Sequence, residues 1–436
     1  MTIHMTSSGK PHPSVRPNPS GKPLAARVQC LRSPGGIEAW LLEDHTLPIL
    51  SMQFGFRGGP TLDPCGRAGT VRMLANLLTE GAGSMDGGTF RRALGDRAIQ
   101  MSFSVWSDSL RGELKTLARE TEAAFDLLCL ALRDPRLAAD DIVRVRSAME
   151  AEVRAGLSRP DQVVNQTFAT RGFAGHPYGQ PTSGDLDSLP RIEQADLAAV
   201  QTRMLNRNNL RVAVVGAIGP DDLCLALDRV FLELPMGAPA QTPAIALQGL
   251  GERIVTRLDL PQSTIRFGRP GPSRKDPDFA AATVVNQCLG GDMSSRLFRE
   301  VRKKRGLCYA MGTALQVADG ASTLVGRTAT RNDRVAEALD VIEAELVRLS
   351  REGLEPDEME RSKGYLIGSS KLRLDSSSAI SALLLGLQLD GRPRDWLDTQ
   401  NTRIAAVTSE DAGRAAARLI GDGRLLVAIA GDPAVP

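Results

Sequence analysis

The 436-residue sequence has few aromatic residues, only four histidines and no apolar run long enough to span a bilayer. Aromatic residues make up 4% of the chain, so leucine and alanine must fill the core. The six cysteines are not paired at metal-ligand spacing, and we interpret them as free thiols, which fits a reducing compartment. The net charge of +2 gives no reason to expect binding to nucleic acid or to a membrane.

The N-terminal stretch is rich in proline, serine and glycine and has almost no large apolar residues. This composition predicts a disordered tail over residues 1–24, which contains His4 and His12. The stretch also lacks the apolar segment of a secretory signal as written. We therefore expect a cytoplasmic protein, or a periplasmic one if the true start of translation differs.

The remaining composition is that of a globular protein, with 42% apolar and 24% charged residues. A chain of this length suits two domains rather than one. A stretch rich in proline and glycine lies near the middle and predicts a linker over residues 234–252. The expected domains are then residues 25–233 and 253–436.

The ends of these two halves repeat each other at a constant offset of 215 positions. The matching pairs are Leu210 and Leu425, Val212 and Val427, Val214 and Ile429, and Gly216 and Gly431. An internal repeat predicts an α+β protein made of two homologous α/β domains, each with an antiparallel-rich sheet packed against helices. The alternative is a chance similarity between two helix-then-strand patterns.

The stretch Gly290–Tyr309 combines a glycine pair, an amphipathic helix and the start of a strand at Tyr309. Met293, Leu297 and Val301 are spaced by four, which predicts a buried side, and Gly306 is suited to end the helix. The glycine pair is not followed by Gly-Lys-Ser/Thr, so we interpret it as a turn rather than a phosphate loop. The rest of the helix surface is basic: Arg296, Arg299, Arg302, Lys303, Lys304 and Arg305.

The Gly290–Tyr309 stretch and the loop His176–Gly184 resemble the pitrilysin and mitochondrial-processing-peptidase family. The resemblance covers nearly the whole chain after the tail and implies one half of a clam-shell. Active members of that family are zinc peptidases. They carry His-x-x-Glu-His on the first helix of the first domain and a further glutamate ligand downstream.

This sequence lacks that motif. By alignment of the helix before Gly81, Arg72 and Asn76 replace the two histidines, and Ala75 replaces the glutamate that activates water. Glu152 stands where the last ligand is expected, with Glu150 as the alternative register. The remaining histidines, His45 and His176, form no such motif and are interpreted as structural. We therefore expect this chain to bind no zinc and no other cofactor.

The resemblance implies a different role for the second half. Zinc-free subunits of the family pair with a zinc-bearing homologue and present to its metal an arginine and a tyrosine seven residues apart, which here are Arg302 and Tyr309. A tyrosine hydroxyl can donate to the oxyanion of amide hydrolysis, and arginine offers a planar set of donors to a carbonyl or carboxylate. The alternatives are a solvated helix face for Arg302 and a half-buried strand position for Tyr309.

The sequence therefore predicts a non-catalytic subunit of a heterodimeric zinc metallopeptidase, with zinc in the partner and a peptide or an unfolded protein as substrate. The predicted edge strand near residues 99–105 could bind substrate by strand addition. The alternative is a structural or scaffold subunit of the same fold with no proteolytic role.

Overall fold

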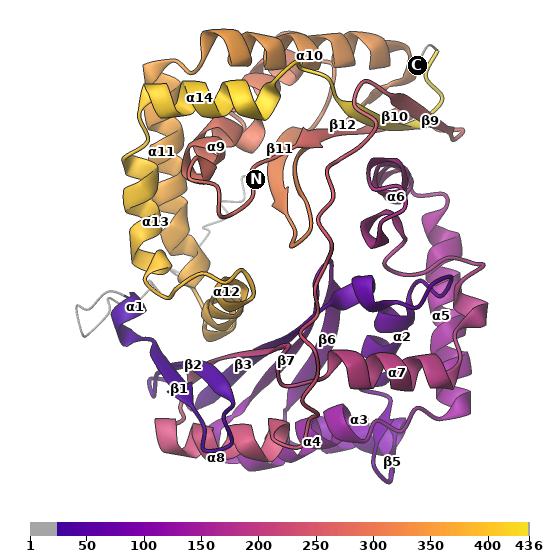
Figure 1. Cartoon of the computed structure of the whole chain (residues 1–436). Helices are drawn as coiled ribbons and strands as arrows, with labels where there is room; N and C mark the ends of the chain where they lie inside the picture. Colours follow the sequence, from indigo (N-terminus) through magenta and orange to yellow (C-terminus); the bar gives the residue numbers. More distant parts are fainter. Residues whose placement is uncertain (1–23, 435–436) are drawn as a thin grey trace, which may run out of the picture.

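The computed structural model describes residues 24–434, so the predicted tail lies, apart from Leu24, outside the described residues. Two sheets face the centre of the molecule, and most helices lie outside them (Figure 1). The first sheet has the strand order β1-β2-β8-β3-β7-β6. Its strands are β1 (Gln29–Arg32), β2 (Glu38–Glu43), β3 (Ile49–Arg57), β6 (Gln100–Trp106), β7 (Ser109–Leu117) and β8 (Leu210–Gly216).

The second sheet repeats the plan of the first, with the order β11-β12-β10-β13-β9. In each sheet one neighbouring pair is parallel, β2 with β8 and β13 with β9, and the other pairs are antiparallel. The strands are β9 (Arg253–Arg257), β10 (Gln262–Pro270), β11 (Met311–Val317), β12 (Ser322–Arg331) and β13 (Leu426–Gly431). A small hairpin joins β4 (Gly81–Ala82) and β5 (Met85–Asp86).

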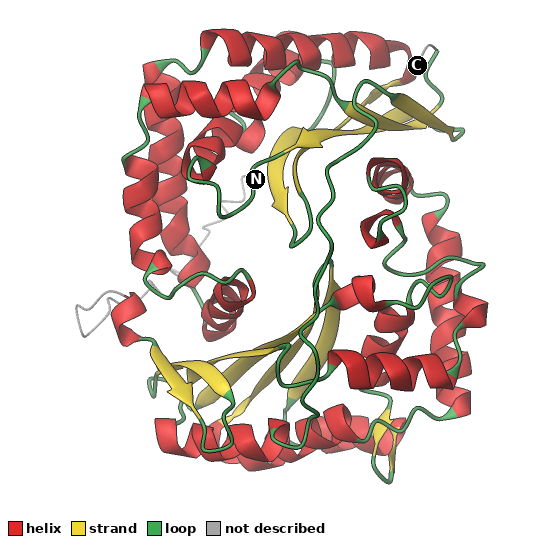
Figure 2. Cartoon of the chain, viewed as in Figure 1, coloured by secondary structure: helices red, strands yellow, loops and turns green. Residues whose placement is uncertain are grey.

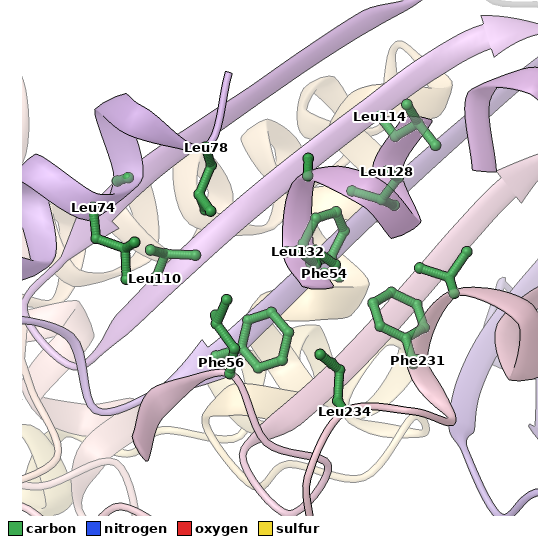
Figure 3. Close-up of a cluster of buried hydrophobic side chains, with 14 of the residues drawn as sticks. Phe54, Phe56, Leu74, Leu78, Leu110, Leu114, Leu128, Leu132, Phe231 and Leu234 are labelled. Atoms are coloured by element: carbon green, nitrogen blue, oxygen red, sulfur yellow. The ribbon is translucent and has the colours of Figure 1, made fainter. Parts of the chain in front are cut away.

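The core of the first half lies between its sheet and the surrounding helices (Figure 3). Phe54 of β3 is fully buried, and its ring lies 5.8 Å from that of Phe231 and 6.2 Å from that of Phe56. These few aromatic rings stack edge-on among leucines, as expected for a core poor in aromatic residues. The helices are α1 (Leu24–Arg27), α2 (Thr70–Leu77), α3 (Gly87–Gly95), α4 (Thr121–Arg133), α5 (Ala139–Gly156), α6 (Pro160–Gly172), α7 (Gln194–Met204) and α8 (Pro220–Phe231).

The second half has its own core on the outer face of its sheet, where Ile265 and Phe267 of β10 meet buried helix residues. The helices are α9 (Phe279–Asn286), α10 (Val335–Glu352), α11 (Pro356–Ser370), α12 (Ser377–Leu389), α13 (Trp396–Ala405) and α14 (Ser409–Ile420). Two π-helical segments, Gln287–Gly291 and Phe298–Lys304, follow α9.

Each half contributes one helix to the sheet of the other half (Figure 2). Helix α6 packs on β13 and β10, where Phe168 joins Leu426 and Ala428 in an apolar cluster. Helix α12 packs on β3 and β8, where Leu384 and Leu385 join Val215. Part of the inner face of each sheet is thus covered by a helix that lies far from that sheet's strands in the sequence.

Local details support the duplication. Helices α7 and α14 begin with capping boxes at equivalent positions, Glu193 with Asp196 and Thr408 with Asp411. Gly216 and Gly431 both have positive φ, +141° and +155°, at the ends of β8 and β13. The predicted fold class, two homologous α/β units with antiparallel-rich sheets, is confirmed. Residues 232–252, between α8 and β9, contain no helix or strand.

Candidate functional site

The basic helix is anchored in the core of the second half. Leu297 and Val301 are fully buried, as predicted, but Met293 is 69% exposed and does not belong to the buried side. The four-residue spacing fails there because residues 292–295 form a break between the two π-helical segments. A π-helical turn is also wider than an α-helical one, which changes the residues that share a face.

Arg296 was expected on the exposed basic face, but it is buried at 4% exposure. Its Nε donates to both carboxylate oxygens of Glu358, at 3.0 and 3.1 Å, and its Nη2 donates to the Gly353 carbonyl at 2.9 Å. Burial alone would lower the pKa of Arg296, but the hydrogen bonds to Glu358 outweigh it and raise the pKa. Arg296 therefore links the helix to α11, and its buried guanidinium is not accessible to a ligand.

Three further cations of the helix share the carboxylate of Glu300. Its buried carboxylate accepts hydrogen bonds from Lys304 at 2.8 Å, Arg305 at 3.0 Å and Arg299 at 3.5 Å. Burial would raise the pKa of Glu300, but the Lys304 and Arg305 hydrogen bonds outweigh it and lower the pKa to about 2. The carboxylate is therefore ionised at neutral pH and offsets one of the three positive charges that it contacts.

Arg302 is left without a carboxylate partner among residues 24–434. Its guanidinium carbon lies 4.8 Å from the ring centre of Phe298 and 4.8 Å from that of Tyr309. Both distances are within the range of favourable cation–π attraction. Both rings lie close to the guanidinium, and none of its N–H groups has a hydrogen-bond partner among residues 24–434, so these donors are available to an acceptor.

Tyr309 is 84% exposed and precedes β11, which begins at Met311. The predicted strand start at Tyr309 and the alternative of a half-buried strand residue are therefore wrong. Two side chains of β12 hold the backbone on either side of Tyr309. Thr330 Oγ1 donates to the Leu307 carbonyl at 2.6 Å, and Thr328 Oγ1 donates to the Ala310 carbonyl at 2.8 Å. An exposed tyrosine on a fixed backbone is suited to contact another molecule.

The glycine pair before the helix has a packing role. A Cβ atom on Gly290 would lie 2.5–2.8 Å from atoms of Thr313 on β11, so only glycine lets the chain pass this close. Gly291 likewise lies against the Gln287 side chain. The interpretation of the pair as a turn is compatible with these contacts.

The position of the zinc motif lies on α2, which packs against α5. Arg72 and Asn76 are partly buried, and Ala75 is buried at 3% exposure. Glu152 is exposed on α5, whereas Glu150 pairs with Arg154 at 3.0 Å. Within residues 24–434 no three His, Cys, Asp or Glu side chains gather as a metal site would require. A guanidinium, a methyl and an amide do not fit a zinc ion.

The two histidines within the described residues, His45 and His176, make contacts that stabilise loops. His45 pairs with Glu43 at 2.8 Å on the surface. His176 is buried, contacts the Pro243 carbonyl through Nε2 at 3.0 Å and accepts the backbone N–H of Tyr178. The loop His176–Gly184 is thus tied to the segment that connects the halves. His4 and His12 lie outside the described residues.

This fold defines a peptidase-like protein, and the part of the chain that the structure describes contains no zinc-ligand set. Comparison with protein families matches residues 191–366 to the peptidase M16 inactive domain, and that range includes Arg302 and Tyr309. A crystal structure of a peptidase M16 inactive domain from Pseudomonas fluorescens superposes with a TM-score of 0.87 at 23% identity, covering 94% of this chain and 98% of that one. At this identity the likeness concerns the fold.

Curated relatives include both a non-peptidase homologue and proteins named zinc proteases. A non-peptidase homologue, YmxG, from Helicobacter pylori is 24% identical over 77% of this chain and 78% of its own length. An uncharacterised zinc protease from Streptomyces coelicolor is 26% identical over 88% of this chain and 85% of its own. Together with the inactive-domain match, these findings confirm the resemblance to the M16 peptidases, and the chain is similar to non-catalytic as well as to peptidase-named relatives.

The sequence pointed to Arg302 and Tyr309 but not to Phe298, which forms the second ring against Arg302. Its position four residues before Arg302 was the available signal, because side chains four apart on a helix meet. The predictions for Arg296 and Met293 were wrong, since their environment depends on chain segments far away in sequence.

Proposed function

We propose that this chain is the zinc-free subunit of a heterodimeric zinc metallopeptidase, and that Arg302 and Tyr309 act at the zinc of the partner. The observation that carries the proposal is that Arg302 lies against two aromatic rings and has no carboxylate partner among residues 24–434, whereas Arg299, Lys304 and Arg305 share the carboxylate of Glu300. A cation held between two aromatic rings and left without a counter-ion is ready to bind an anionic or carbonyl oxygen.

Tyr309 and Arg302 have different roles in this proposal. Amide hydrolysis places negative charge on the carbonyl oxygen in the transition state, and the Tyr309 hydroxyl donates a hydrogen bond to that oxygen. The Arg302 guanidinium binds a neighbouring backbone carbonyl of the peptide and orients it. The zinc of the partner would activate the attacking water, which this chain cannot do because it has no ligand set or general base at Arg72, Ala75 and Asn76.

Substrate binding by strand addition is part of the proposal. Strand β6 lies at the end of the first sheet and pairs only with β7, and β11 lies at the end of the second sheet and pairs only with β12. An extended peptide can hydrogen-bond to either free edge regardless of its side chains. This mode suits a peptide or an unfolded protein as substrate.

The test reconstitutes the chain with a zinc-bearing homologue from the same source and follows cleavage of a quenched fluorogenic peptide. We expect no cleavage by this chain alone and cleavage by the pair. Tyr309→Phe should lower kcat by about 10²-fold, the size typical of a lost oxyanion donor. Arg302→Gln should chiefly raise KM, and Arg302→Lys should rescue it only in part because an ammonium lacks the planar fork.

Lys303→Gln is the matched control, because Lys303 is the exposed neighbour of Arg302 on the same helix. It should leave turnover unchanged, and size-exclusion chromatography should show the same assembly for every variant. Unchanged turnover in Tyr309→Phe and Arg302→Gln pairs would instead support the scaffold role.

We also propose a cytoplasmic location. Within the described residues no helix is long and apolar enough to cross a membrane. Fractionation of cells that express the full-length protein tests the location, and recovery in the periplasmic fraction would contradict it.

A further inference from the structure

A cavity of about 1170 Å³ lies between the two halves. It is lined by α5 and α6, by the loop after His176, and by the ends of the edge strands β6 and β11. Most polar groups in its wall are amides and hydroxyls, among them Gln162, Asn165, Gln166 and Gln316. The cavity wall is thus largely uncharged: it combines apolar side chains with amides and hydroxyls, and few ionic groups line it.

Arg266 of β10 lines this cavity on the inner face of the second sheet. Its Nη1 donates to Asn165 Oδ1 at 2.7 Å, and its Nη2 donates to Gln316 Oε1 at 2.8 Å. The guanidinium carbon lies 5.0 Å from the ring centre of Phe168. The side chain is therefore held from α6 and from the edge strand β11 at once.

These partners leave the charge of Arg266 uncompensated. Both bonded acceptors are neutral amides, and no ion pair to Arg266 occurs among residues 24–434. Its Nε is enclosed and has no hydrogen-bond partner. A guanidinium has five N–H donors, so each Nη group keeps one unused donor beside the cavity.

The residues around Arg266 add a second positive charge, which favours the binding of an anion. Arg327 lies directly opposite Arg266 on β12, and its partner Asp161 is 3.6 Å away with both side chains 60% exposed. Burial, together with repulsion from Arg327, lowers the pKa of Arg266 to about 10. A partly buried cation beside a second cation is unfavourable unless an anion joins it.

Other charges of the cavity wall do not supply that anion. Arg274 pairs with Asp390 at 3.3 Å. Asp185 accepts the backbone N–H groups of Asp187 and Ser188 at 3.0 and 2.7 Å, and Glu152 is exposed on α5. The unpaired positive charge in the wall is therefore localised at Arg266.

Apolar side chains accompany this charge. Trp106 at the end of β6 is 55% exposed, Leu157 after α5 is 60% exposed, and both line the cavity. Exposed large apolar residues beside a partly buried cation without a counter-ion are typical of a site for an amphiphilic ligand.

We propose that the cavity binds a peptide through one of its carboxylates, which pairs with the two unused Nη donors of Arg266. The carboxylate can be the C-terminal carboxylate or that of an aspartate or glutamate side chain, since both present the same two oxygens to a guanidinium. The peptide chain then extends past Trp106 and Leu157 toward the free edges of β6 and β11.

This inference shares with the proposed function the idea that the ligand is a peptide that reaches the free edges of β6 and β11. The site belongs to this chain alone and needs neither zinc nor a partner subunit. A binding measurement on the isolated chain therefore tests the carboxylate site, whereas cleavage by the reconstituted pair tests the proposed function.

The experiment measures binding of three ten-residue peptides of Ala, Ser and Leu to the isolated full-length chain, by calorimetry and by fluorescence of an N-terminal dansyl group. The first peptide has a free C-terminal carboxylate, the second a C-terminal amide, and the third a C-terminal amide with one internal aspartate. We expect the first or the third to bind at least about tenfold more tightly than the second, since a lost charged hydrogen bond typically costs that much. The stronger of the two identifies the source of the carboxylate.

Arg266→Gln should abolish the preference for the charged peptide, and Arg266→Lys should retain part of it. Arg269→Gln is the matched control, because Arg269 is a buried arginine on the same strand with its side chain on the opposite face, near Arg424 and Asp422. If Arg266→Gln does not fold, as judged by circular dichroism, the Arg266→Lys comparison carries the test. Equal binding of the charged and amidated peptides, no binding at 1 mM peptide, or equal loss in the Arg266 and Arg269 variants would overturn the proposal.

Discussion

Replacing Arg296 by methionine should strongly destabilise the half of the molecule that carries the basic helix. Arg296 links the helix to Glu358 of α11, and it lies 3.8 Å from Glu345 of α10. The side chains of the two glutamates are only 9% and 6% exposed. Methionine removes the charge that both carboxylates face while keeping most of the side-chain volume.

The expected loss of stability in Arg296→Met depends on the hydrogen bonds that Glu358 and Glu345 keep. Removing one member of a buried ion pair costs about 3–5 kcal/mol, because the other charge stays buried without compensation. Here Glu358 keeps a hydrogen bond from the Glu355 backbone N–H at 2.9 Å, and Glu345 keeps Arg348 at 2.8 Å. We therefore expect the lower end, about 3 kcal/mol, or a fall of about 6–12 °C in Tm for a unit of this size.

Urea unfolding followed by circular dichroism measures this loss, and a double-mutant cycle isolates the ion pair. Glu358→Leu alone should also be destabilising, whereas Arg296→Met combined with Glu358→Leu should recover much of the stability, because no uncompensated charge remains in that pair. A loss below about 1 kcal/mol for Arg296→Met, or strict additivity of the two changes, would refute the reasoning.

Two further predictions concern stability. Because the pKa of Glu300 is about 2 in the folded protein, below its usual 4.5, its contribution is present above pH 4.5 and is lost as the pH falls toward 2. The difference in unfolding free energy between wild type and Glu300→Gln, on the order of 1–3 kcal/mol at pH 6, should shrink across that window, and a constant difference would contradict it. Gly216→Ala should destabilise by more than about 1 kcal/mol, because its Cβ would lie 2.2 Å from the Ile49 carbonyl oxygen at a φ of +141°. Gly95→Ala in α3, with no atom within 4 Å of its Cβ, is the control and should be neutral or stabilising in the same urea assay.

Local pattern was sufficient for many elements of the fold. Helix α8, for example, begins at Pro220 and has Asp221 and Asp222 in its first turn, which are helix start signals within the sequence itself. The repeat at an offset of 215 positions predicted paired strands that end in glycine, as β8 and β13 do. Such elements can be predicted from the sequence because their start signals, periodicity and end signals all lie within a short stretch of chain.

The exchange of α6 and α12 between the halves could not be predicted in this way. Helix α12 is apolar on most sides, so its sequence indicates burial without indicating a direction. Its contacts with β3 and β8 join residues more than 150 positions apart, such as Gln388 and the Val212 carbonyl. Only the closed tertiary structure determines which sheet receives which helix.

The sequence by itself determined what this chain cannot do at its own first helix, because Arg72, Ala75 and Asn76 are the wrong chemical groups for zinc in any conformation. It also determined the spacing of Arg302 and Tyr309. The tertiary structure decided that Arg296 is unavailable to a ligand, because its carboxylate partner comes from a distant part of the chain, whereas Glu300 pairs with cations of its own helix. Arg296 is paired with Glu358, 62 positions away, whereas Arg302 lies close to two rings and its N–H groups have no hydrogen-bond partner among residues 24–434.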